Sequence, residues 1–115
     1  MQPGVEAFIQ NMTELGFEAT LEAELVICRV VALDGAFAGT PVETGVAIGE
    51  LEPWPHVPPH WLHFPGSVKF AQTNSQPSPK SGWLMHSRQI TGWSDAPAGI
   101  AWASHVRAVL SEAVA

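Results

Sequence analysis

Hydrophobic residues near the start of the chain recur every three or four positions, which is the spacing of one face of a helix. These positions are Val5, Phe8, Ile9, Met12 and Leu15. Pro3 is tolerated in a first helical turn, and Gly16 is placed to end the helix. The pattern therefore predicts a short amphipathic helix over residues 4–15.

After this helix the hydrophobic period changes to two. Apolar and polar residues alternate over 17–25, and residues 25–33 are almost wholly apolar. This pattern predicts one strand that is half exposed at first and buried on both faces later. Residues 34–39 contain two glycines and mark a reversal, and residues 42–48 alternate again. The two runs are therefore expected to pair as an antiparallel hairpin.

Residues 53–65 contain five prolines in thirteen positions. Proline removes a backbone donor and fixes φ, so no regular helix can run through this segment. We expect an ordered extended loop here, with a brief strand at 61–64. Residues 66–82 are polar and predict a mobile surface excursion, after which residues 83–85 re-enter the core.

The C-terminal segment returns to helical spacing. Its periodic apolar residues are Ile100, Ala103, Val106, Val109, Leu110 and Ala113. Ser94, Asp95 and Pro97 suit a cap and first turn, so a helix of about four turns is predicted. The order of elements predicts one α+β domain over residues 1–115, with an N-terminal helix, an antiparallel meander of three to four strands, a proline-rich strip and a C-terminal helix.

Composition supports a folded chain and excludes several classes of protein. Of the 115 residues, 46% are hydrophobic and only 14% are charged, which excludes an intrinsically disordered chain. No apolar run approaches the roughly 20 residues that cross a bilayer. Met1-Gln2-Pro3-Gly4 opens neither a basic region nor a signal-like apolar core. We therefore expect no membrane partner and a cytoplasmic location.

The formal charge of −6 is distributed unevenly along the chain. The first 52 residues hold nine acids and one base, which gives −8, whereas the remainder holds two acids and four bases, which gives +2. Nucleic-acid affinity comes mostly from Lys and Arg that neutralise phosphates, so this acidic chain is a poor candidate for it. This uneven distribution of charge has two explanations. It could orient two protein partners on opposite ends of the domain, or the acids could simply lie on solvent-exposed strand faces.

Two parts of the sequence resemble ubiquitin-conjugating (UBC) domains. Trp54-Pro55-His56-Val57-Pro58-Pro59, followed by Trp61-Leu62-His63-Phe64, is similar to the Tyr-Pro-x-x-Pro-Pro element and next strand of these domains. The stretch 83–89, Trp93, and a helix containing Trp102, His105 and Arg107 resemble the C-terminal part of a bacterial family of conjugating-domain relatives. Genes of that family tend to lie beside genes for ubiquitin-like proteins and activating enzymes.

This resemblance covers the chain from about residue 20 to 112. It implies a UBC-like fold, with a ubiquitin-like modifier and its activating enzyme as partners. It also implies a partner-binding surface on the proline and tryptophan elements, formed by Trp54, Pro55, Pro58, Pro59, Trp61, Trp83 and Trp93. Because the five tryptophans are spread over four segments, a packed core that holds the irregular, proline-rich chain together accounts for them better than a ligand groove does.

The chain departs from conjugating enzymes in its cysteine. Those enzymes carry the modifier as a thioester on a cysteine after the loop that follows the proline-rich strand, and the corresponding stretch 81–89 contains none. The single cysteine, Cys28, lies in the most apolar part of the first strand, where a thiolate is disfavoured. We expect Cys28 to be an inert buried residue that forms neither a disulfide nor a zinc site.

His86-Ser87-Arg88 is the best reactive cluster in the sequence. Ser87 could accept an acyl group as an oxyester, with Arg88 as electrostatic stabiliser. The base would be His86, or a folded-in histidine such as His63 or His105. Neighbouring strand residues face opposite ways, so His86 serves Ser87 directly only if the segment is a turn.

The structural alternative is that Ser87 caps a turn and that Arg88 pairs with Glu22 or Glu24. Asn74 in the polar loop is a weak match to the asparagine that precedes the active position in conjugating enzymes.

His56, His60 and His63 have spacings that invite a metal site. The intervening prolines forbid the helix that would put them on one face, and no carboxylate beyond Glu50 and Glu52 is near enough in sequence to complete a tetrahedral set. We therefore expect no metal, and expect the rings to pack on tryptophans with their nitrogens bonded to loop carbonyls. No phosphate-binding glycine motif is present, so no nucleotide or other cofactor is expected.

Three functions remain open. The first is a UBC-like component of a bacterial ubiquitin-like modification pathway, which receives or positions the modifier and, if it is an enzyme, uses Ser87 as acceptor. The second is a non-catalytic UBC variant that scaffolds an activating enzyme or modifier. A remoter third is a free-standing domain that binds a small molecule or peptide through its tryptophans.

Overall fold

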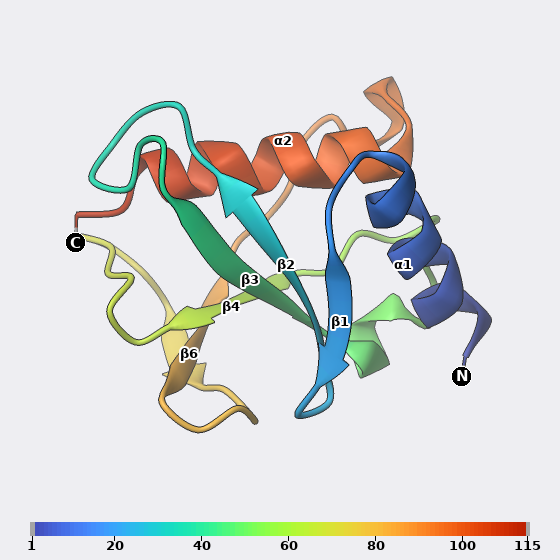
Figure 1. Cartoon of the computed structure of the whole chain (residues 1–115), viewed down its shortest axis with the longest axis horizontal. Coiled ribbons are helices and arrows are strands. Elements are labelled where there is room, and N and C mark those ends of the chain that lie inside the picture. The colour runs from blue at the N-terminus through green and yellow to red at the C-terminus, as the bar shows by residue number, and fades with distance from the viewer. Residues whose placement is uncertain (1, 115) are drawn as a thin grey trace.

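The computed structural model describes residues 2–114, which form two α-helices and a six-stranded antiparallel sheet (Figure 1). The helices are α1 (Pro3–Glu14) and α2 (Ala98–Ser111), with 3₁₀ turns η1 (Ile48–Leu51) and η2 (Trp93–Asp95). The strands are β1 (Ala19–Glu22), β2 (Leu25–Val31), β3 (Pro41–Ala47), β4 (Trp61–Pro65), β5 (Ser75–Pro77) and β6 (Trp83–Ser87). Their order is β1-β2-β3-β4-β6-β5. The α+β class is confirmed, and the sheet is larger than the predicted meander.

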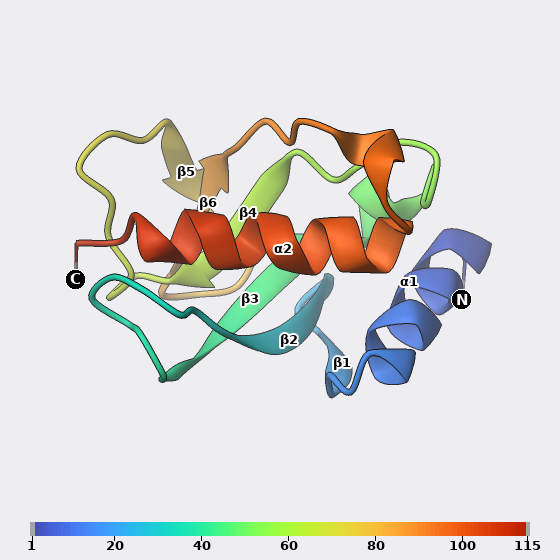
Figure 2. The same ribbon diagram turned by 90° about the horizontal axis from the view of Figure 1, so that it is seen from above.

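Helix α2 lies across one face of the sheet, and α1 lies beside one end of α2, close to β1 (Figures 1 and 2). We call the side of the sheet that α2 covers the helix face, and the other side the open face. Directly paired residues of antiparallel strands point to the same side of a sheet. The register therefore places Val26 and His86 on the helix face, and Ile27, His63 and Ser87 on the open face.

The main core lies between the helix face and the two helices. Phe8 of α1 packs edge-on against Trp54 and Trp102, with ring centroids 4.8 and 5.0 Å away. Trp102 of α2 is fully buried. A smaller apolar cluster of Leu25, Ile27 and Trp83 lies on the open face. The prediction that the apolar run of residues 25–33 is buried on both faces is thus confirmed only for residues 25–28, because Arg29, Val31 and Leu33 are exposed.

The long strand predicted from residue 17 is wrong, because the segment forms two strands joined by a tight turn. Ala23 and Glu24 have positive φ angles of 52° and 64°, and Glu22 pairs directly with Leu25. A two-residue hairpin turn with positive φ at both positions is normally Asn-Gly, Asp-Gly or Gly-Gly. Ala-Glu carries no such signal, and the alternation of apolar and polar residues continues straight through the turn.

The proline-rich segment is folded into turns before β4 begins. Within it, the N–H of Trp54 donates to the carbonyl of Leu51 at 3.1 Å, and the N–H of His56 donates to that of Pro53 at 2.8 Å. Only the short strand at its end, β4, is extended as predicted. The polar excursion of residues 66–82 is not only a surface loop, because β5 within it pairs with β6.

Both predicted helices are confirmed. Gly16 follows the end of α1 with a φ of 91°, as expected for the glycine that was predicted to end this helix. The residue that precedes α2 is Pro97, with no side-chain cap, whereas Ser94 and Asp95 lie in η2 and not at the cap. Within residues 2–114, neither helix combines the length and the apolar character that crossing a bilayer requires.

Candidate functional site

The pairing of β4 with β6 brings His60 and Ser87 together. Trp61 opens β4 and lies opposite Ser87, which ends β6, so the residue before β4 comes to lie beside this serine. The hydroxyl oxygen of Ser87 and Nε2 of His60 are 2.5 Å apart. The N–H of Arg88 also donates to the His60 carbonyl at 3.1 Å, which extends the pairing past the strand ends. We call these two side chains the His60–Ser87 pair.

The carboxylate of Glu50 holds the backbone at this histidine. It accepts hydrogen bonds from the N–H groups of His60 at 2.9 Å and Trp61 at 3.3 Å. Glu50 lies in η1, directly after β3, so a third element reaches the site. Because the carboxylate bonds the backbone and not the ring, it fixes where His60 lies and leaves the tautomer of the imidazole free. The ring is exposed and packs edge-on against Trp61, with centroids 5.6 Å apart.

Arg88 lies next to the pair, and its guanidinium is already engaged. Nη1 donates to the Ser87 carbonyl at 2.9 Å and to Oγ1 of Thr73 at 3.2 Å, and the group stacks over Phe70 at 4.7 Å. The arginine therefore braces the end of β6. It also borders a shallow depression of about 170 Å³, lined by Pro58, Pro59, His60, Arg88, Gln89 and Ile90.

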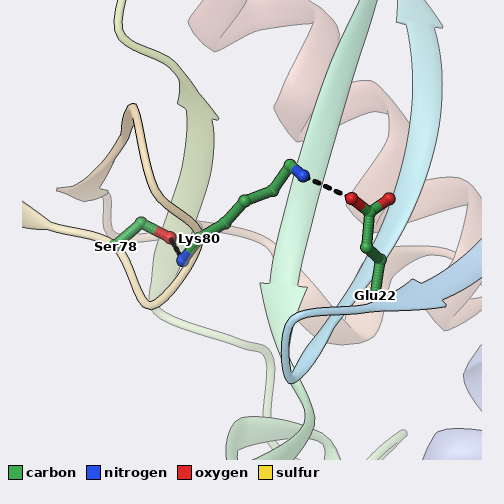
Figure 3. Close-up of polar contacts among 3 residues, drawn as sticks. All are labelled: Glu22, Ser78 and Lys80. Carbon is green, nitrogen blue, oxygen red and sulfur yellow. Dashed lines mark hydrogen bonds and ion pairs between the residues drawn. The ribbon is translucent and has the colours of Figure 1, made fainter.

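The ion pair predicted between Arg88 and Glu22 or Glu24 is not formed. Glu22 pairs with Lys80, whose side chain crosses the open face to reach it (Figure 3). Glu24 sits in the turn between β1 and β2. The prediction for Arg88 is therefore wrong, because its guanidinium is taken up by Thr73, the Ser87 carbonyl and Phe70.

His86 lies on the opposite face of the sheet from the Ser87 side chain, as the alternation of strand residues predicted. Its ring is 2% exposed, packs against Phe70 at 4.9 Å, and has Nδ1 2.8 Å from Oγ1 of Thr73. Burial, and then the charge of Arg88, lower its pKa below the usual value. The structure thus does not bring His86 to Ser87.

The other two folded-in histidines contact neither member of the pair. His63 is 1% exposed, with Nδ1 2.8 Å from the hydroxyl of Ser78, and burial lowers its pKa to about 4. His105, on α2, borders a groove beside residues 89–92, and burial together with nearby Arg88 lowers its pKa. His60 is therefore the histidine that meets the serine, and the expected bases lie elsewhere.

The three histidines of the proline-rich segment do not converge. His60 and His63 contact different hydroxyls and not loop carbonyls, and His56 is exposed. Among residues 2–114, no three His, Cys, Asp or Glu side chains come together as ligands of a metal ion would. Asn74 contributes through its backbone, since its carbonyl accepts the N–H of Ser87 at 2.8 Å.

Cys28 faces the core from the middle of β2. It is 1% exposed, and burial raises the pKa of its thiol to about 12. The thiolate is therefore inaccessible at neutral pH, and the expectation of an inert, buried cysteine is confirmed.

Two of the tryptophans predicted to bind partners belong to the core. Trp54 is 4% exposed, and its Nε1 donates to Oδ1 of Asn11 at 2.9 Å. Trp83 is a buried member of the open-face cluster, with the ammonium of Lys80 5.5 Å from the centroid of its ring. These side chains hold the domain together and are not available to a partner.

Other residues of that predicted surface remain accessible in part. Trp61 and Trp93 are half-buried, and Nε1 of Trp93 donates to the carbonyl of Pro55 at 3.0 Å. Pro55 is exposed, Pro58 half-buried and Pro59 buried. The accessible part borders a depression of about 330 Å³ lined by Pro55, His56, Trp93, Ser94, Ala96 and Ala98.

Comparison with known protein families, with curated proteins and with solved structures finds no match for this chain.

Sequence reasoning missed two residues of the site. Glu50 was weighed only as a metal ligand, and His60 only as part of a histidine cluster. The sequence does hold a signal for both, since Glu50 shortly precedes the proline-rich segment and His60 directly precedes the strand at the end of that segment. It identifies His60 as the partner of Ser87 only when the register of β4 against β6 is known.

Proposed function

We propose that this chain is a cytoplasmic, UBC-like component of a bacterial ubiquitin-like modification pathway. In this proposal it accepts the carboxyl terminus of the modifier as an oxyester on Ser87, with His60 as general base. The observation that carries the proposal is the 2.5 Å contact between the Ser87 hydroxyl and Nε2 of His60, where β4 begins and β6 ends. The resemblance of residues 54–64 and 83–107 to conjugating domains supplies the class of substrate.

The chemistry requires only the donor thioester. Nε2 of His60 removes the hydroxyl proton as Oγ of Ser87 attacks the thioester carbonyl of the modifier on its activating enzyme. The C–O bond forms, the C–S bond breaks, and the proton passes from the imidazole to the departing thiolate. Glu50 keeps His60 in place during this transfer, and Arg88 braces the backbone of the serine.

The test is to incubate the chain with its activating enzyme, modifier and ATP. The expected adduct resists thiols, is cleaved by hydroxylamine and is lost in Ser87→Ala. Ser81→Ala is the matched control, because Ser81 is an exposed serine in the turn before β6. An adduct that is cleaved by thiols, or that persists in Ser87→Ala, overturns the proposal.

A second candidate is a non-catalytic module that scaffolds the activating enzyme or the modifier. It is supported by the exposed apolar surface near Pro55, where Val57 is 53% exposed and Trp93 is half-buried. This candidate predicts that Ser87→Ala binds the partners with unchanged affinity, whereas Trp93→Ala binds them more weakly. A binding titration of these two variants, together with the adduct assay, separates the two functions.

A further inference from the structure

Residues 71–82, which we call the edge segment, run along the outer edge of the sheet and include β5 (Figure 2). Two hydroxyls of this segment reach histidines that project from opposite faces of the sheet. Oγ1 of Thr73 lies 2.8 Å from Nδ1 of His86 on the helix face. Oγ of Ser78 lies 2.8 Å from Nδ1 of His63 on the open face. One segment is therefore held by two imidazoles, one from each face.

Both imidazoles are buried, and in each ring only one of the two nitrogens has a hydrogen-bond partner in the described part of the chain. His63 and His86 are 1% and 2% exposed, and in each ring Nε2 is buried with no hydrogen-bond partner among residues 2–114. A neutral ring tolerates this, because Nδ1–H can donate to the hydroxyl while Nε2 keeps a bare lone pair. A protonated ring carries N–H on both nitrogens, so one donor of a cation would be buried and unpaired.

We propose that His63 and His86 form an acid-sensitive clamp, which holds the edge segment on the sheet while both rings are neutral and releases it when they are protonated. We call these two residues the histidine clamp. The proposal rests on the two hydroxyl contacts and on the unpaired, buried Nε2 atoms, and it does not depend on the chemistry of Ser87. Burial lowers the pKa of both rings, which agrees with a closed state that excludes the proton.

The charges on the helix face favour release on protonation. His86 packs between aromatic rings and lies near the guanidinium of Arg88, which repels a second positive charge. Helix α2 contributes His105, which also lies near Arg88. A charge on His86 further disfavours protonation of His63. No carboxylate bonds either ring among the residues that the structure describes.

The open face likewise supplies no counter-charge to His63. The residues directly paired with it are Gly45 of β3 and Met85 of β6, which are uncharged. The edge segment brings Lys80 to this face, and its ammonium is bound by Glu22, as Figure 3 shows. A protonated His63 would therefore face one hydroxyl, apolar groups and a carboxylate that already has a partner.

The measurement is amide hydrogen exchange at pH 7.5 and pH 4.5, with rates corrected for the intrinsic pH dependence of exchange. A histidine with a pKa near 6.5 when released and about 4 when clamped shifts the opening equilibrium on the order of 10²-fold over this range. We expect that increase in the edge segment at opening free energies below that of global unfolding, with β2 and β3 remaining better protected than the edge segment at both pH values. Equal protection of the edge segment at the two pH values overturns the proposal, and so does exchange of the edge segment, β2 and β3 in one common step at pH 4.5.

Variants identify the groups that titrate. In the double variant His63→Asn and His86→Asn, each amide can still bond the hydroxyl but cannot be protonated, so the acid-induced opening should disappear. His56→Asn is the matched control, because His56 is exposed and lies outside the edge segment and the histidine clamp. Glu22→Gln measures how much of the opening comes from the ion pair. Acid-induced opening that persists undiminished in the double variant overturns the proposal.

A second pair of variants covers the case in which the double histidine variant does not fold. Thr73→Ala and Ser78→Ala together remove both hydroxyls from the edge segment and leave the buried rings in place. The clamp then predicts faster exchange of the edge segment already at pH 7.5. Exchange equal to that of the wild type at pH 7.5 counts against it.

Discussion

The His60–Ser87 pair and the histidine clamp use the same two functional groups in different surroundings. The exposed pair meets at 2.5 Å, and both contacts of the clamp measure 2.8 Å. The imidazole of the exposed pair is accessible, as the proposed role of a general base requires. The clamp rings are 1% and 2% exposed and leave one nitrogen unpaired, so protonation there is disfavoured and the contacts hold a segment in place. If the exposed pair reacts as we propose, burial decides whether an imidazole and a hydroxyl form a reactive group or a structural contact.

Removing the base should have the largest effect. A positioned general base contributes about 10²–10⁴-fold to a rate, so His60→Asn should slow oxyester formation on Ser87 by roughly that factor. Single-turnover transfer from the charged activating enzyme measures it, with His56→Asn as the control. If His60→Asn transfers at the wild-type rate, the exposed pair is a structural contact like those of the clamp.

The pH dependence of stability should follow the clamp. Because the pKa of His63 falls from 6.5 in the unfolded chain to about 4 in the fold, the unfolded chain binds more protons between these values. Stability should therefore be complete above pH 6.5 and decrease as the pH falls toward 4. The contribution of His63 is on the order of 3 kcal/mol, at about 1.4 kcal/mol per pKa unit. Urea unfolding across this range tests it, and a slope that His63→Asn leaves unchanged would assign the effect to other groups.

Truncation of a histidine at neutral pH should distinguish the two environments. His86→Ala leaves a cavity beside Phe70 and removes one of the two hydrogen bonds of the Thr73 hydroxyl, so we expect a loss of about 2–3 kcal/mol in the free energy of unfolding. His60→Ala removes an exposed ring and should change stability by no more than about 0.5 kcal/mol. Chemical denaturation at pH 7.5 compares them. Similar losses in the two variants would mean that burial does not separate these contacts.

Removing the ion pair on the open face should have the smallest effect on the free energy of unfolding. The Lys80 and Glu22 side chains are 22% and 55% exposed, and exposed pairs contribute about 0–1 kcal/mol. A double-mutant cycle with Lys80→Gln and Glu22→Gln should give a coupling energy in this range, and about 1 M salt should remove most of it. A larger coupling that resists salt would place the ion pair beside the clamp as a main tether of the edge segment.

The parts of the fold that the sequence predicted are those with a local signal. Hydrophobic spacing predicted both helices and the pairing of β2 with β3. Glycines added to the signal at the end of α1 and in the turn between the two strands. The turn at Ala23 and Glu24 was missed because its backbone shape is imposed by strand pairing, against the preferences of both residues.

The candidate site was predictable in part. Ser87 and its neighbours stand out by residue type alone, and the alternation of strand residues already separated Ser87 from His86. The partnership with His60 depends on the register of two strands that are separated by a long polar segment. Such a register is set by the packing of the whole sheet, so no local pattern of residues contains it.

Among the side chains that the structure describes, the Lys80–Glu22 contact is the only ion pair, and it joins two oppositely charged halves of the sequence. The half with formal charge −8 supplies α1 and the adjacent strands β1, β2 and β3, and the half with +2 supplies β4, β6, β5 and α2. One ion pair leaves nearly all of this charge uncompensated, so the molecule carries an electric dipole across the width of its sheet. In the field of a charged macromolecule such a dipole experiences a torque. We therefore expect the chain to be oriented before it touches a charged partner. The side of the sheet with β4, β6 and β5 would face negative charge, and the edge formed by β1 would face away from it.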